Sequence, residues 1–175
     1  MKKDLFKYSL TGFVFVSVFG TLMHFLYEWS GCNTAVGLFA PINESTWEHL
    51  KMIFFPYLIW SIAEYIMLKK QKGVFSAKFI GVFTGIAAIV VFFYTYTGIF
   101  GKSIEILNIL SFFIGVFAAF LTDYMIIKSE KLSSIRCDTI FIAAFIIVGA
   151  LFVIFTVAPP FIPLFKDPIN STYGI

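Results

Sequence analysis

The sequence predicts an all-α membrane protein in which five helices span the bilayer, with the N-terminus in the cytoplasm and the C-terminus outside. The first observation is composition: 59% of the 175 residues are hydrophobic and only 13% are charged, too few to cover a water-soluble surface. The second is a set of five apolar segments, each close to the roughly 20 residues that a helix needs to cross about 30 Å of hydrocarbon. The third is the distribution of basic residues between these segments.

The predicted spans follow one another along the whole chain and form a single domain, residues 1–175. They are residues 8–27, 49–68, 79–99, 106–127 and 139–159. The first span follows basic residues, as in a signal peptide, but its apolar stretch is too long and no small-residue cleavage site follows, so we expect it to remain a membrane helix. Short polar loops join most spans. We expect the longer segment 28–48 and the tail 159–175 to pack on the outer face.

Lysine and arginine gather on one side of the membrane when the five predicted helices run up and down. Ten of the thirteen fall on the side of the N-terminus: Lys2, Lys3, Lys7, Lys69, Lys70, Lys72, Lys78, Lys128, Lys131 and Arg136. The other three are Lys51, Lys102 and Lys166. By the positive-inside rule the richer side is cytoplasmic. The net charge of +3 then faces anionic lipid, which argues against nucleic acid as a partner.

The start of the second span carries a helix-capping pattern. Ser45 and Glu48 fit a capping box, in which the serine oxygen accepts from the Glu48 amide and the Glu48 side chain accepts from the Ser45 amide. Acidic residues there also favour the positive end of the helix dipole, which is a structural explanation for both Glu44 and Glu48.

The outer half of the first helix carries its small and polar residues on one face. They recur at helical spacing as Ser17, Gly20, Thr21, His24 and Glu28. We expect this face to look into the bundle, with His24 at hydrocarbon depth and Glu28 one turn above it. Because ionisable groups at such depth are functional or paired, we expect His24 and Glu28 to form a coupled pair.

The outer ends of the third and fourth spans bring further polar residues to the same level. Tyr94 and Tyr96 lie near the end of the third helix, and Asn108 lies near the start of the fourth. We therefore expect one outer hollow that combines these residues with the histidines and carboxylates. Gly81 and Gly85 have the spacing that lets helix backbones approach, and we interpret them as packing residues.

Two histidines with two or three carboxylates form a ligand set that suits Zn²⁺, Mn²⁺ or Fe²⁺. The predicted metal ligands, which are also the predicted catalytic residues, are His24, Glu28, Glu48 and His49. The residues predicted to bind a ligand are Glu44, Tyr94, Tyr96 and Asn108. The same set could perform acid/base chemistry without a metal. No H-E-x-x-H, G-x-S-x-G or cysteine ligand set occurs, so the pattern does not specify a reaction.

The remaining ionisable residues receive structural explanations. Cys32 falls in the first outer loop and Cys137 at the cytoplasmic start of the last helix, so we expect no internal disulfide. Glu64 and Asp123 lie within about two turns of the cytoplasmic boundary, where a side chain can reach headgroups or a snorkelling lysine. A continuous proton path from them to the outer residues is not the favoured interpretation.

Two sequence motifs stand out, one at the start of the second span and one in the tail. They are P-x-N-E-S-x-W-E-H-L-K at residues 41–51, and P-P-x-I-P-L-F-x-D at residues 159–167 followed by Y-G-I at residues 173–175. With these motifs the chain resembles, over nearly its whole length, an uncharacterised family of small bacterial membrane proteins, a domain of unknown function. The resemblance implies a bacterial cytoplasmic membrane location and transfers no catalytic role.

Three classes of function remain open. The outer residues could form the metal or acid/base site of a membrane-embedded enzyme acting on a lipid-like or other amphipathic substrate. The bundle could instead bind or transport a small solute, with a partner subunit or as a homo-oligomer. In the third class the loop and tail only cap the bundle, which serves as an accessory component.

Overall fold

The computed structural model describes residues 2–129, 132 and 135–175. The long helices are α1 (Lys2–Trp29), α3 (Thr46–Met67), α4 (Val74–Phe100), α5 (Glu105–Ser129) and α6 (Ile135–Val157). Two short elements, α2 (Thr34–Gly37) and the 3₁₀ helix η1 (Pro163–Phe165), lie in the long loop and the tail. All five long helices contain a stretch long and apolar enough to cross a membrane, which confirms the predicted all-α membrane fold.

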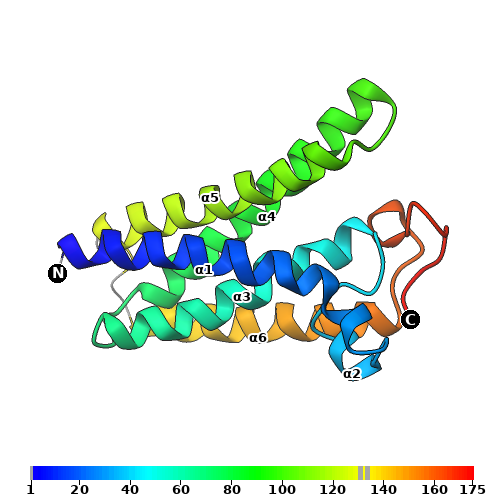
Figure 1. The fold of residues 1–175 in the computed structure, drawn as a ribbon. Coiled ribbons are helices and arrows are strands. Elements are labelled where there is room, and N and C mark those ends of the chain that lie inside the picture. The colour runs from blue at the N-terminus through cyan, green and yellow to red at the C-terminus, as the bar shows by residue number, and fades with distance from the viewer. Residues whose placement is uncertain (1, 130–131, 133–134) are drawn as a thin grey trace.

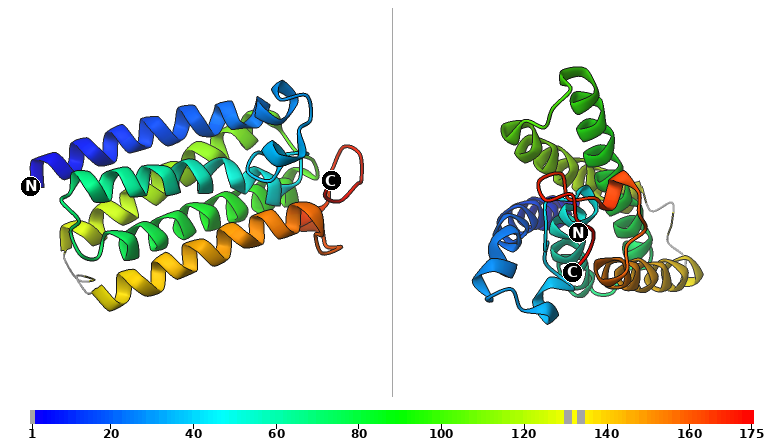
Figure 2. Two further views of the ribbon diagram at one scale, coloured as in Figure 1. Left: turned by 90° about the horizontal axis from the view of Figure 1, so that it is seen from below. Right: turned by 90° about the vertical axis from the view of Figure 1, so that its right-hand side faces the viewer.

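The long helices pack side by side, and the two termini lie at opposite ends of the bundle (Figures 1 and 2). α3 lies in the middle and packs against α1, α4 and α6, while α4 and α5 form a hairpin. The far end of this hairpin, around residues 100–105, diverges from the other helices (Figure 1). Termini at opposite ends agree with an odd number of spans. Which end is cytoplasmic stays a prediction. Lys131, one of the ten basic residues on which this prediction rests, lies outside the described residues.

The core forms where α3 meets its neighbours. Ile53, Phe54 and Tyr57 of α3 are fully buried. α4 and α5 approach closely because a side chain is missing at two points: a Cβ at Gly81 would lie 2.7 Å from the Ala119 carbonyl oxygen, and one at Gly85 would lie 2.5 Å from that of Gly115. The interpretation of Gly81 and Gly85 as packing residues is therefore confirmed.

The outward faces of the long helices are apolar. Large exposed side chains include Leu10 and Val14 of α1, Val91 of α4, and Ile146 and Ile147 of α6. In water such faces would be costly, whereas in a bilayer the surrounding lipid is equally apolar. These surfaces therefore suit contact with lipid.

The segment before α3 and the tail fold over the end of the bundle that carries the C-terminus (Figure 1). Trp47 packs between Phe152 of α6 and Phe165 of η1, with ring centroids 4.6 and 4.8 Å away. The Ile175 amide donates to the Thr156 carbonyl at 3.0 Å, which ties the tail to the end of α6. The free Cys32 is exposed at this end, and the side chain of Cys137 lies outside the described residues, so the absence of a disulfide stays a prediction.

The orientation of the bundle can be tested with fusions. A reporter that is active only in the cytoplasm should give a signal when fused after Lys72, because the loop that follows α3 is rich in lysine. The same reporter fused after Ile175 should give none, since an odd number of spans places the tail on the other side. Signal from the tail fusion would contradict the predicted orientation.

Candidate metal site

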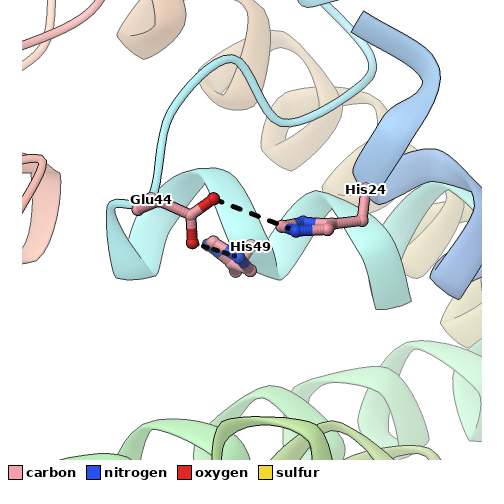
Figure 3. A group of neighbouring side chains, drawn as sticks. All are labelled: His24, Glu44 and His49. Carbon is pink, nitrogen blue, oxygen red and sulfur yellow. Dashed lines mark ion pairs between the residues drawn. The ribbon is translucent and has the colours of Figure 1, made fainter. Parts of the chain in front are cut away.

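Three side chains from different parts of the chain meet at the end of the bundle near the C-terminus. His24 comes from the last turns of α1, Glu44 from the loop before α3, and His49 from the first turn of α3 (Figure 3). One potential ligand atom from each lies within 4.8 Å of the others. Two imidazoles and a carboxylate are thus brought together by tertiary structure.

The carboxylate of Glu44 bridges the two imidazole rings. Its Oε2 lies 3.4 Å from His49 Nε2, and its Oε1 lies 3.9 Å from His24 Nε2. The two rings are themselves close, with centroids 5.2 Å apart. Their side chains keep 34% (His24), 43% (Glu44) and 30% (His49) of their surface exposed, so an ion or small molecule can reach them.

The local sequence fixes two of these residues through the start of α3. Ser45 is the N-cap: its backbone is extended and its Oγ accepts from the Glu48 amide at 3.3 Å, as the capping pattern predicts. Glu44 therefore stands immediately before the helix, where the dipole favours a negative charge. His49 lies in the first turn, and its Nδ1 is 3.0 Å from the Ser45 carbonyl oxygen.

The contact between His49 and Ser45 decides which nitrogen of His49 carries a proton. A carbonyl oxygen only accepts, so Nδ1 must donate, and in the neutral ring Nε2 then holds a lone pair. That lone pair faces an oxygen of Glu44 at 3.4 Å. Two acceptors face one another favourably only when a positive charge, a proton or a metal ion, lies between them.

Two of the three separations between the ligand atoms approach those of a tetrahedral metal site, and the third, between the two histidine nitrogens, is no more than 4.8 Å. With metal–ligand bonds of about 2.0–2.1 Å, neighbouring ligand atoms lie about 3.3 Å apart. The His49 to Glu44 separation of 3.4 Å already matches this value, whereas the 3.9 Å from His24 to Glu44 requires a small movement of half-exposed side chains. The Nδ1 of His24 is buried without a hydrogen-bond partner among the described residues.

Glu28, a predicted ligand and the expected partner of His24, is not brought to this group. It is exposed at the end of α1, and no ion pair joins it to His24 in the part of the chain that the structure describes. The physical reason is that the loop before α3 supplies Glu44 to His24 instead. A carboxylate at an exposed helix end keeps its water and gains little from pairing.

Glu48 was expected as a metal ligand, and the structure gives it another role. It is buried, and its Oε2 accepts from Lys51 Nζ at 2.6 Å and from the Ile42 amide at 3.1 Å. Lys51 also donates to the Gly37 carbonyl at 2.8 Å and to Thr156 Oγ1 at 2.5 Å. Consecutive helical residues point about 100° apart, so Glu48 and His49 cannot share a face. The i,i+3 spacing of Glu48 and Lys51 was the sequence signal for this pair.

The second half of the predicted capping box is therefore not formed. The Ser45 amide donates to Asn43 Oδ1 at 3.0 Å rather than to Glu48. The buried lysine competes successfully for the Glu48 carboxylate because it offers a full charge, whereas the amide offers only a dipole.

Tyr94, Tyr96 and Asn108 do not join the histidines in one hollow. The Tyr96 hydroxyl donates to Asn108 Oδ1, and it also lies 3.3 Å from Ser103 Oγ. Tyr94 is exposed. Tyr96 and Asn108 join the two helices at the far end of the α4–α5 hairpin, which diverges from α1 and α3 (Figure 1). The position of these residues along their helices predicted the same depth in the membrane as His24. That position carries no information on the divergence of the hairpin.

Glu64 and Asp123 are also placed differently from expectation. Neither reaches the headgroups: both are fully buried, and both pair with Lys78, which lies inside α4 rather than in a cytoplasmic loop. The burial of these three charges was not apparent from the sequence, because each residue taken singly lies near a predicted helix end.

The whole chain, residues 1–175, matches the model of a family described as a family of unknown function, DUF6512. The chain belongs to this family. Its membership confirms the resemblance to an uncharacterised family, while the bacterial source and the motifs stay predictions. Neither the curated proteins nor the solved structures that were compared contain a match to the chain.

The pair of Glu48 and Lys51 can be tested by a double-mutant cycle. Glu48→Gln or Lys51→Met alone should lower the free energy of unfolding by about 3–5 kcal/mol, because each leaves the other charge buried without its partner. The double variant should lose clearly less than the sum of the two. Equilibrium denaturation in detergent would measure these values. Glu28→Gln is the control, with an effect within about 0.5 kcal/mol, and strictly additive losses would contradict the pairing.

Proposed function

We propose that this chain is an integral membrane protein that binds one divalent transition-metal ion, Zn²⁺ fitting best, through His24, Glu44 and His49. The observation that carries the proposal is the convergence of three ligand atoms of the types that zinc prefers, within 4.8 Å of one another. Mn²⁺ and Fe²⁺ accept the same donors. The excess of basic residues at the other end of the bundle supports an extracytoplasmic location for the site.

The second shell of His49 also supports a metal. A metal-binding histidine usually donates its other ring N–H to a carbonyl or carboxylate, which fixes the tautomer and leaves a lone pair for the metal. His49 has this arrangement through Ser45. The lone pair of a neutral Nε2 and the facing carboxylate oxygen repel each other unless a positive charge lies between them. A metal ion would supply this charge while binding both atoms.

The coordination suggests a catalytic rather than a purely structural site. Structural zinc sites are closed by four protein ligands, whereas a set of two histidines and one carboxylate leaves a position for water or substrate. Such an ion can activate a bound water or polarise a carbonyl or phosphoryl oxygen. The half-exposed site at the end of an apolar bundle would accept a lipid-like or other amphipathic substrate. Without a metal, the same groups would serve acid/base chemistry or bind a small polar ligand.

Elemental analysis of the purified protein tests the proposal directly. After loading with zinc and removal of excess, wild type should retain close to one ion per chain. His24→Ala, Glu44→Gln and His49→Ala should each weaken binding by more than about 100-fold, because each removes a ligand. Glu28→Gln is the matched control and should retain the metal, since Glu28 lies outside the group.

Two results would overturn the metal assignment. One is a wild-type protein that retains no zinc, manganese or iron after loading. The other is metal retention by Glu44→Gln equal to that of wild type. Either result would favour the solute-binding or accessory classes of function over the enzyme.

Zinc should also stabilise the fold. At a free concentration of about 100 times Kd, the free energy of unfolding should rise by about 2.7 kcal/mol, since the ion binds the folded state alone. Thermal or chemical unfolding of wild type with and without zinc would measure the change. Glu44→Gln should show no comparable increase, and equal stabilisation of both proteins would indicate binding elsewhere.

A further inference from the structure

A second group of charged residues lies inside the bundle, in the half nearer the N-terminus. Lys78 of α4 stands between two carboxylates: its Nζ lies 2.6 Å from Glu64 Oε2 of α3 and 2.7 Å from Asp123 Oδ2 of α5. All three side chains are fully buried. Three helices thus contribute one charge each to an enclosed site.

Neutral side chains complete the surroundings of the two paired oxygens. The Tyr57 hydroxyl donates to Asp123 Oδ2, and Trp60 Nε1 donates to Glu64 Oε2 at 3.0 Å. The Lys78 ammonium also lies 4.7 Å from the centroid of the Phe120 ring.

Among the described residues, the neighbouring helices add no further charge that acts on Asp123 or Lys78. The ionisable side chains that interact with Asp123 and Lys78 are Glu64 and Tyr57, besides each other. α1 covers the group with Gly12, which packs against Trp60 and Phe120. α6 packs beside α4 through aromatic rings, including Phe141 and Phe145 against Phe79.

The second oxygen of each carboxylate makes no hydrogen bond to the described residues. Glu64 Oε1 and Asp123 Oδ1 are buried, and neither has a hydrogen-bond partner among the described residues. A buried polar atom without a partner is costly, and the cost is lower when the carboxylate is protonated and neutral.

The charges of the group do not balance. Two ionised carboxylates and one ammonium leave a net charge of −1 in a fully buried site. Two carboxylates that share a buried site relieve this repulsion by holding one proton between them. A bound metal cation would call for several oxygen ligands, whereas among the described residues only two side-chain oxygens of this group lack a hydrogen-bond partner.

We propose that Glu64, Lys78 and Asp123 form a proton-binding site that holds one exchangeable proton on its pair of carboxylates. Ionisable groups enclosed within a membrane bundle serve as proton relays in pumps and transporters, so the site would couple protonation to the activity of the protein. This site is separate from the proposed metal site: Glu64 follows His49 by fifteen positions along α3, which is about 22 Å at 1.5 Å per residue. The proposal does not depend on metal binding.

Infrared spectroscopy of the protein in lipid nanodiscs, with ¹³C-labelled aspartate and glutamate, tests the proposal. Wild type at neutral pH should show the C=O stretch of a protonated carboxylic acid, and the band should shift in D₂O. Glu64→Gln and Asp123→Asn should each abolish the band, because one carboxylate then suffices for one ammonium. Glu105→Gln, which changes an exposed carboxylate, should keep it.

Three results would overturn the proposal. They are the absence of the protonated band from wild type at neutral pH, its persistence in both Glu64→Gln and Asp123→Asn, and its loss when sodium or another metal cation is added. The first result decides the matter even if a variant fails to fold, because it needs only the wild-type protein. Zinc content plays no part in this measurement, so its outcome is independent of the metal assignment.

Discussion

Charge buried in a low-dielectric helix bundle requires a partner within hydrogen-bonding distance, and the central helix α3 meets this constraint twice. Near its start, Glu48 pairs with Lys51, and near its end Glu64 pairs with Lys78 of α4. If either pair were broken, an unpaired charge would remain where water cannot reach it. The pair of Glu64 and Lys78 joins α3 to α4, and Lys51 also donates to Thr156 of α6. These contacts therefore restrict how α3 can rotate about its axis or slide past its neighbours. Apolar packing by itself tolerates many arrangements, and these polar contacts favour one of them for α3.

The first of these pairs also positions the candidate metal site. Lys51 donates to the carbonyl oxygens of Gly37 and Ala40, and Glu48 accepts from the Ile42 amide. The backbone of residues 37–42 is thereby held against α3, and Glu44 follows two residues later. A ligand carried by a loop is usually poorly fixed, but here buried ionic contacts support the loop directly before it. Glu48 thus helps to hold the loop that precedes Glu44, whereas it was expected to bind the metal itself.

The two proposed sites differ in the way that their chemistry requires. The group of His24, Glu44 and His49 lies at one end of the bundle and is half-exposed, so ions and ligands can exchange. The group of Glu64, Lys78 and Asp123 is enclosed on all sides, and a proton is the species that such a site can hold without further ligands. For a family of unknown function, the two sites provide separate experimental starting points.

The sequence by itself determined the features that depend on local properties. Five apolar stretches of spanning length determined the membrane bundle, and Ser45 determined the start of α3, because burial in lipid and helix capping act within one segment. Only the tertiary structure decided which charge meets which: His24 faces Glu44 rather than Glu28, and Lys78 joins Glu64 to Asp123. The reason is geometric. Helical spacing places a residue on a face of its helix and at a depth in the membrane. Its partner depends on the rotation of each helix, the path of the loops and the divergence of the α4–α5 hairpin, and no single segment encodes these.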